Sequence, residues 1–160
     1  MSTLSIIVIA LVLMISLYTD IKSYKIKNII TVPTALVATI IALIFYPITQ
    51  VLLYVVVLFG IGFIGWLLGL WKAGDVKISL AIGMWAIFIL GEAQLLFVLF
   101  YYLAFILTHL AIGHFLILKS CKFHPIRYLK TLVTPANIVY GRLPATITIM
   151  CSFVLVILLF

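Results

Sequence analysis

The sequence predicts an all-α polytopic membrane protein that forms a single domain over residues 1–160. The first observation is composition: 68% of the residues are hydrophobic and 8% are charged, with a mean hydropathy of +1.47. A soluble chain of this size cannot bury so much apolar surface, because its surface stays large relative to its volume. The second observation is that six apolar segments follow one another, with lengths near those of bilayer-spanning helices. They occupy roughly residues 2–19, 29–46, 51–70, 76–91, 93–118 and 144–160.

The first, third, fourth and fifth segments have features that bear on their role as membrane spans. A signal peptide requires basic residues ahead of its apolar region, and no basic residue precedes Lys22. We therefore expect the first segment to be retained as a span. The third segment is rich in small residues, which let helix backbones approach closely in lipid. We expect its glycines to pack within the bundle in preference to forming a homodimer; they are Gly60, Gly62, Gly65 and Gly69. The fourth segment is short for a span, and the fifth is long enough to tilt or to emerge from the bilayer.

The basic residues predict how the chain is oriented in the membrane. All ten lysines and arginines fall in the first, third and fifth loops, whereas the second loop, YPITQ, and the fourth, GEAQ, contain none. Six spans therefore place every basic residue on one side, which the positive-inside rule makes cytoplasmic. Both termini are then extracytoplasmic. Because membrane topology explains the net charge of +7, we expect no nucleic-acid partner.

The three acidic residues are the first candidates for chemistry. Asp20 ends the first span and Asp75 begins the fourth, so both are predicted at the cytoplasmic face, whereas Glu92 falls on the opposite side. Acidic side chains near membrane depth usually face a cavity or a partner. Two neighbouring carboxyls would share one proton over a range of pH. The ionised member could activate water while the protonated one polarised a carbonyl, as in aspartic proteases.

Simpler structural interpretations exist for the same residues. Asp75 follows Gly74 and precedes an apolar helix, a position typical of an N-cap. Asp20 could be an interfacial polar residue beside the lysines. Lys77 could tune the site or touch a substrate, or it could extend its ammonium to anionic headgroups. Asn28 could orient Asp20 or cap the second helix.

We expect no metal and no cofactor. His109 and His114 are five residues apart and so lie on different faces of a helix, which disfavours a shared metal ion. Polar packing with Thr108 is the better interpretation of these histidines. Cys121 and Cys151 form no close-spaced pair, so neither a zinc motif nor a disulfide framework is indicated.

Three short stretches carry a resemblance to a known family. AGDVKISLAIG (73–83) resembles the G-x-G-D-x-K-x-x-x-x-x-G signature of type IV prepilin peptidases, which are membrane aspartic proteases. The positions that match are Gly74, Asp75, Lys77 and Gly83. DIKSYKIKN (20–28) is similar to the family's first catalytic motif at Asp20, Ile26 and Asn28. GRLPATI (141–147) resembles a segment before the family's last span. The sequence departs from the family pattern at Lys72, where a glycine is expected, and at Lys27, where proline is usual.

The resemblance implies an activity and a set of site residues. It implies an endopeptidase of the cytoplasmic membrane that cuts, after a glycine, the cytoplasmic leader of prepilin-like precursors whose hydrophobic helix lies in the bilayer. Asp20 and Asp75 would be catalytic, with Gly74, Lys77 and Asn28 in support. The chain is similar to the short, stand-alone members associated with Flp-type pilins of tight-adherence systems. It lacks the four-cysteine cytoplasmic domain of bifunctional members, so neither zinc nor N-methyltransferase activity is expected.

Two other functions remain open on the sequence. The carboxyls could relay protons in a proton- or ion-coupled transporter, although the inverted repeat expected of many transporters is not evident. The chain could also be a catalytically inactive pilus-assembly subunit, for which Lys72 at the glycine position is the one hint. The basic loop from Lys119 to Leu143 could cover the cytoplasmic face and gate a site, or could serve only as a topology anchor.

Overall fold

The computed structural model describes residues 1–23, 26–68, 71–91, 94–124, 126 and 145–159. The regular elements within these ranges are all α-helices. They are α1 (Ser2–Ser23), α2 (Asn28–Phe45), α3 (Ile48–Leu67), α4 (Ala73–Leu90), α5 (Gln94–Ser120) and α8 (Ala145–Ile157). The basic loop that follows α5 lies largely outside the described residues, so the expectation that it gates the site stays a prediction, and Glu92 is outside them too.

Five of these helices, α1 to α5, are long and apolar enough to cross a membrane. They coincide with the first five predicted segments, which confirms a polytopic helical membrane protein. The sixth segment forms α8, whose 13 residues give a length of about 20 Å, short of the roughly 30 Å hydrocarbon core. The count of six spans and the outward-facing termini therefore stay predictions.

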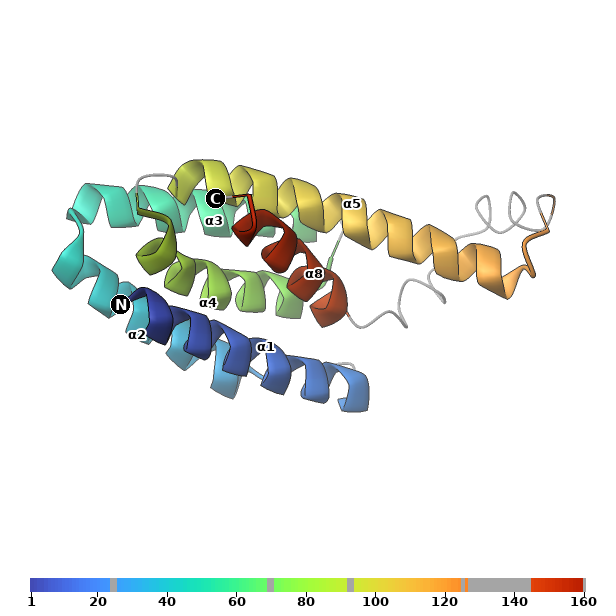
Figure 1. Cartoon of the computed structure of the whole chain (residues 1–160), viewed down its shortest axis with the longest axis horizontal. Helices are drawn as coiled ribbons and strands as arrows, with labels where there is room; N and C mark the ends of the chain where they lie inside the picture. Colours follow the sequence, from blue (N-terminus) through green and yellow to red (C-terminus); the bar gives the residue numbers. More distant parts are fainter. Residues whose placement is uncertain (24–25, 69–70, 92–93, 125, 127–144, 160) are drawn as a thin grey trace.

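Helix α4 is the centre of the bundle. It packs against each of α1, α2, α3, α5 and α8, and Figure 1 shows it running between the pair α1 and α2 and the pair α3 and α5. Nearly every residue of α4 from Asp75 to Ile87 is buried, including the small residues Ala81, Gly83 and Ala86. A helix that is apolar all round is stable only when it is surrounded. The other helices expose large apolar side chains on their outer faces, as a lipid-facing surface requires.

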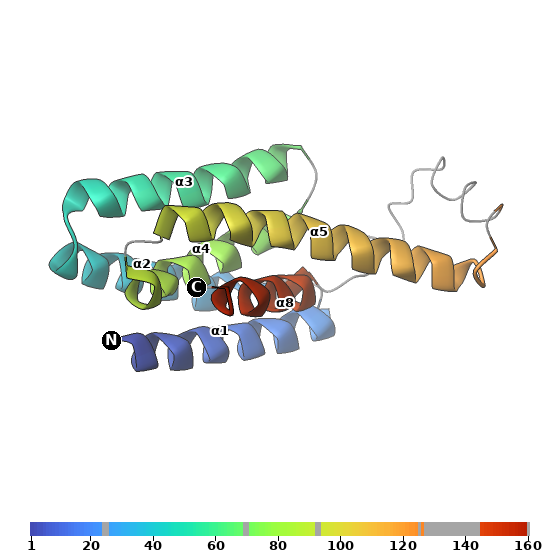
Figure 2. The same ribbon diagram turned by 45° about the horizontal axis from the view of Figure 1, so that its top comes forward.

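The two ends of the bundle are distinct. The C-terminal end of α1 and the N-terminal ends of α4 and α8 lie together at one end, as Figure 1 shows. Helix α8 lies beside α1, which is clearest in Figure 2. The 27-residue α5 extends past the other helices at the same end, as the length of the fifth segment predicts. Gly91 separates α4 from α5, with a φ of 56° in the left-handed region that suits glycine.

The glycines of α3 pack within the bundle at two of the four predicted positions. A Cβ at Gly65 would overlap the indole of Trp71, and the Trp71 Nε1–H donates a 2.7 Å hydrogen bond to the Gly62 carbonyl. The prediction of intramolecular packing is therefore confirmed for this pair. At Gly60 a Cβ would have nothing within 4 Å, and Gly69 lies outside the described residues.

Candidate active site

Asp20 and Asp75 meet at the end of the bundle where α1 finishes and α4 begins. Asp20 is three residues from the end of α1, Asp75 is in the first turn of α4, and the two helices pack together. Their side chains are 7% and 5% exposed, respectively. The two carboxyls lie close enough to interact electrostatically. The structure thus brings together the two acidic residues that the charge pattern assigned to one membrane face.

Asp75 is held by the backbone that precedes its own helix. Its Oδ2 accepts a 2.8 Å hydrogen bond from the backbone N–H of Lys72. The helix begins at Ala73 with Lys72 as the N-cap, so the expectation that Asp75 is itself the N-cap is wrong. The carboxylate instead occupies the third helical position and reaches back, as the acidic partner of a capping box does. Lys72 has φ −88° and ψ 160°, an extended conformation that does not require the glycine of the family pattern.

Asp20 is held by a different helix. Thr146, at the start of α8, donates to Asp20 Oδ2 from its backbone N–H at 3.2 Å and from its hydroxyl at 2.9 Å. The first N–H groups of a helix lack intrahelical acceptors, and a carboxylate near them is also favoured by the helix dipole. Thr146 is fully buried. Thr146 lies within GRLPATI but is not among the predicted site residues; the signal was a threonine beside the start of a helix.

The supporting residues connect the first motif to the start of α4. A Cβ on Gly74 would lie 3.3 Å from the Cβ of Ile26, so the absence of a side chain lets the segment before α2 pack against α4. Lys77 Nζ donates a 2.9 Å hydrogen bond to Asn28 Oδ1. Asn28 is the first residue of α2, whose N-cap is Lys27, and the described contacts do not join it to Asp20. The expectation that Asn28 caps the second helix is therefore wrong, and the expectation that it orients Asp20 stays a prediction.

Buried hydroxyl groups lie deeper in the bundle. Ser79, one turn below Asp75, shares a 2.8 Å hydrogen bond with the hydroxyl of Tyr101, and Tyr101 in turn interacts electrostatically with Asp75. The hydroxyls of Ser16, one turn from Asp20 on α1, and of Thr31 on α2 are buried and have no hydrogen-bond partner among the described residues. Such groups are available to hydrogen-bond a water molecule or a bound peptide.

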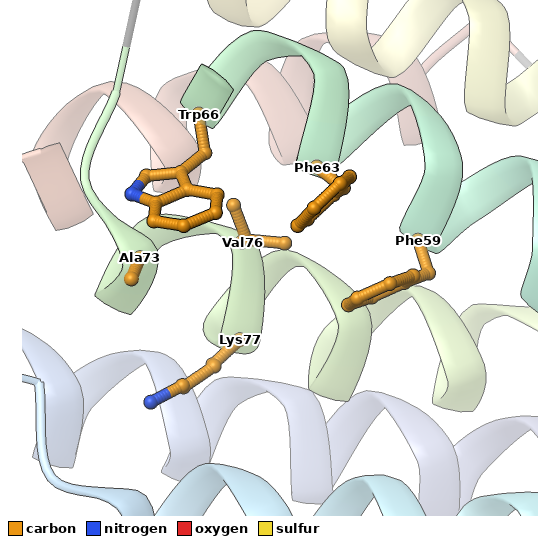
Figure 3. Close-up of a pocket in the computed structure, with 6 residues that line it drawn as sticks. All are labelled: Phe59, Phe63, Trp66, Ala73, Val76 and Lys77. Carbon is orange, nitrogen blue, oxygen red and sulfur yellow. The ribbon is translucent and has the colours of Figure 1, made fainter. Parts of the chain in front are cut away.

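An apolar groove of about 160 Å³ lies between α3 and α4, beside the turn that carries Asp75. Its lining residues are Phe59, Phe63, Trp66, Ala73, Val76 and Lys77. The three aromatic rings form a continuous row, with centroid separations of 5.7 Å and 5.4 Å between successive rings. Figure 3 shows the Lys77 ammonium directed away from these rings, so that only the aliphatic part of its side chain borders the groove.

His109 belongs to the packing of α8 against α5. Nδ1 of His109 lies 3.4 Å from the hydroxyl of Thr148, and the hydroxyl of Thr108 lies 2.8 Å from that of Ser152. His109 and Thr108 thus each make a polar contact with α8, and the expectation that the histidines pack with Thr108 stays a prediction. Within the described part of the chain, no group of three His, Cys, Asp or Glu residues is placed to hold a metal ion.

The fold and these residues define a polytopic helical membrane protein with a pair of buried, interacting carboxyls at one end of its bundle. The chain belongs to the type IV leader peptidase family, whose model matches residues 7–117, well over half of its length. The matched segment contains both aspartates and ends within α5, so α8 and Thr146 lie beyond it. Neither the curated proteins nor the solved structures gave a match.

Proposed function

We propose that this protein is a membrane-embedded aspartic endopeptidase that removes the cytoplasmic leader of type IV prepilin-like precursors. The observation that carries the proposal is the pair of buried carboxyls, Asp20 and Asp75, which two packed helices bring within electrostatic range of each other, in a member of the type IV leader peptidase family. Buried carboxyl pairs are costly in a membrane and are retained where they serve a function.

The chemistry follows from the sharing of one proton by the pair. The ionised carboxylate removes a proton from a water molecule, whose oxygen attacks the carbonyl carbon of the scissile peptide. The protonated carboxyl donates its proton to the carbonyl oxygen, which stabilises the tetrahedral intermediate. Collapse of that intermediate breaks the C–N bond, and a proton passes to the leaving amine. Asp20 and Asp75 each use Oδ2 for the hydrogen bonds described above, so we assign these steps to the Oδ1 atoms.

The surroundings of the pair favour a substrate whose hydrophobic helix lies in the bilayer. The apolar groove borders α3 and the same turn of α4 that carries Asp75. Its size suits one or two apolar side chains of such a helix, and their binding would position the adjoining scissile bond. By the positive-inside rule, the lysines near this end of the bundle support a site that faces the cytoplasm, in the cytoplasmic membrane.

The decisive experiment compares three forms of the protein co-expressed with a prepilin-like precursor: wild type, Asp20→Asn and Asp75→Asn. Leader removal is read by gel shift and by mass spectrometry of the mature N-terminus. We expect cleavage by the wild type and a loss of at least about 10²-fold in each variant, the range typical of a general acid or base. Glu92→Gln, a third acidic position, serves as the matched control and is expected to retain cleavage.

Two results would contradict the proposal. Normal processing by both aspartate variants would remove the pair from the mechanism. Failure of the folded wild type to cleave, together with proton flux in proteoliposomes that depends on the aspartates, would favour the transporter; failure without flux would favour an inactive assembly subunit.

A further inference from the structure

The two aspartates are anchored in the same chemical way but by different parts of the chain. Each accepts a backbone N–H from the N-terminus of a helix on its Oδ2 atom. The donor to Asp75 is Lys72, only three residues away, so this bond forms wherever the first turn of α4 forms. The donors to Asp20 come from Thr146, which is 126 residues away in sequence. The geometry of Asp20 therefore depends on where α8 docks.

Helix α8 is docked by contacts that do not involve Asp20. The hydroxyls of Thr108 and Ser152 join it to α5 at 2.8 Å, and Phe153 packs edge-on against Phe97 of α5 with the ring centroids 5.8 Å apart. Because these contacts lie one to two turns further along α8, they fix the position of its first turn. The N–H and the hydroxyl of Thr146 are thus positioned by the bundle, and the carboxylate is oriented by them.

We propose that Thr146 is a positioning residue for catalysis, which holds Asp20 by Oδ2 so that Oδ1 faces Asp75 and the reacting atoms. This inference rests on the proposed peptidase function. Two donors on one carboxylate oxygen fix both the rotation of the carboxyl group and the rotamer of the side chain. Hydrogen bonds to charged groups are the stronger ones, and small misplacements of a catalytic group are costly in rate. Thr146 lies beyond residues 7–117, the part of the chain that the family model matches, so the match itself does not assign this role.

Substitutions that change only the hydroxyl separate positioning from simple structural support. Thr146→Val removes the hydroxyl and keeps the shape, Thr146→Ser keeps the hydroxyl, and Thr146→Cys replaces it with a weak donor. Thr148→Val is the matched control, because Thr148 is equally buried on the same helix and its hydroxyl bonds to the Ala145 carbonyl at 2.7 Å, away from Asp20. The full-length variants are purified, their melting temperatures are measured, and kcat and KM are determined with a prepilin-like precursor.

We expect kcat to follow the donor strength at position 146, with Thr and Ser alike, Cys lower, and Val lower by about tenfold, the equivalent of one hydrogen bond to a charged group. KM is expected to stay within about twofold, because the ground-state contacts to substrate are unchanged. Thr148→Val should keep the wild-type kcat. If Thr146→Val does not fold, the comparison of Thr146→Ser with Thr146→Cys decides the question.

The inference is overturned if the three variants at position 146 cleave at the same rate as the wild type while Asp20→Asn is inactive. It is also overturned if Thr148→Val loses as much kcat as Thr146→Val. In both cases the proposed function survives. A folded wild type that does not cleave, or an Asp20→Asn variant that does, overturns the proposed function and this inference together.

Discussion

Lys77 donates a hydrogen bond to Asn28 across 49 positions of sequence, at 2.9 Å. This contact ties the second turn of α4 to the first residue of α2, and it joins two of the stretches that resemble family motifs. The pair is at the surface of the site end, so its contribution to overall stability is small, below about 1 kcal/mol. The bond matters because it holds the start of α2 beside the part of α4 that carries Asp75.

A double-mutant cycle tests the coupling of Lys77 and Asn28. We expect Lys77→Met and Asn28→Ala each to reduce prepilin processing by a few-fold, and the double variant to be no worse than either single variant, because both remove the same bond. Initial processing rates in proteoliposomes provide the measurement. Lys22→Met, which removes an exposed lysine of α1, is the control. Additive losses in the double variant would mean that the two residues act separately.

The hydrogen bond that Asp75 accepts from Lys72 comes from the backbone N–H and not from the side chain. Lys72→Gly keeps the N–H donor, and the extended backbone there suits either residue, so we expect processing within about twofold of wild type. Lys72→Pro removes the donor, and we expect processing to fall about tenfold, as for the loss of a hydrogen bond to a charged group. Melting temperatures measured alongside distinguish this loss from unfolding. A large gain of activity in Lys72→Gly would show instead that the lysine side chain restrains the site.

The contact between Gly65 and Trp71 predicts a difference between two glycines of one helix. Gly65→Ala places a methyl group against the indole of Trp71, and such overpacking costs about 1–3 kcal/mol. Gly60→Ala meets nothing within 4 Å and gains helix propensity, so we expect it to be neutral or slightly stabilising. Thermal unfolding in detergent compares the two. Equal melting temperatures would contradict the packing described here.

The aromatic groove predicts an effect on substrate binding. Phe63 lines the groove, so we expect Phe63→Ala to raise KM for the precursor by roughly three- to tenfold, the range for losing part of an apolar contact, with kcat little changed. Ile64→Ala is the matched control, since Ile64 is the next residue of α3, is 57% exposed and lies outside the groove. A similar KM for both variants would remove the groove from substrate recognition.

Much of the architecture could be predicted from local hydropathy. The five long helices agree with the predicted segments to within a few residues, because the apolar character that drives a helix into lipid belongs to the segment itself. The largest difference is at the end of α1, which runs to Ser23 and not to residue 19. Helix α4 begins at Ala73 and not near residue 76, because the polar residues Asp75 and Lys77 lower the hydropathy of its first two turns. The distribution of lysine and arginine alone predicted that Asp20 and Asp75 lie at the same end of the bundle, as they do.

The partners of the site residues were decided by tertiary structure. Nothing local to Asp20 indicates Thr146, and nothing local to Asn28 indicates Lys77, because both contacts depend on which helix faces pack together. That choice comes from the fit of large side chains against small ones, as where Trp71 covers Gly65, and from the burial of α4 on every side. Sequence patterns therefore determined which segments enter the membrane and which carboxyls share a face. Packing decided what orients Asp20, since contacts between distant helices are a property of the assembled bundle, whereas Asp75 is held by the backbone just before its own helix.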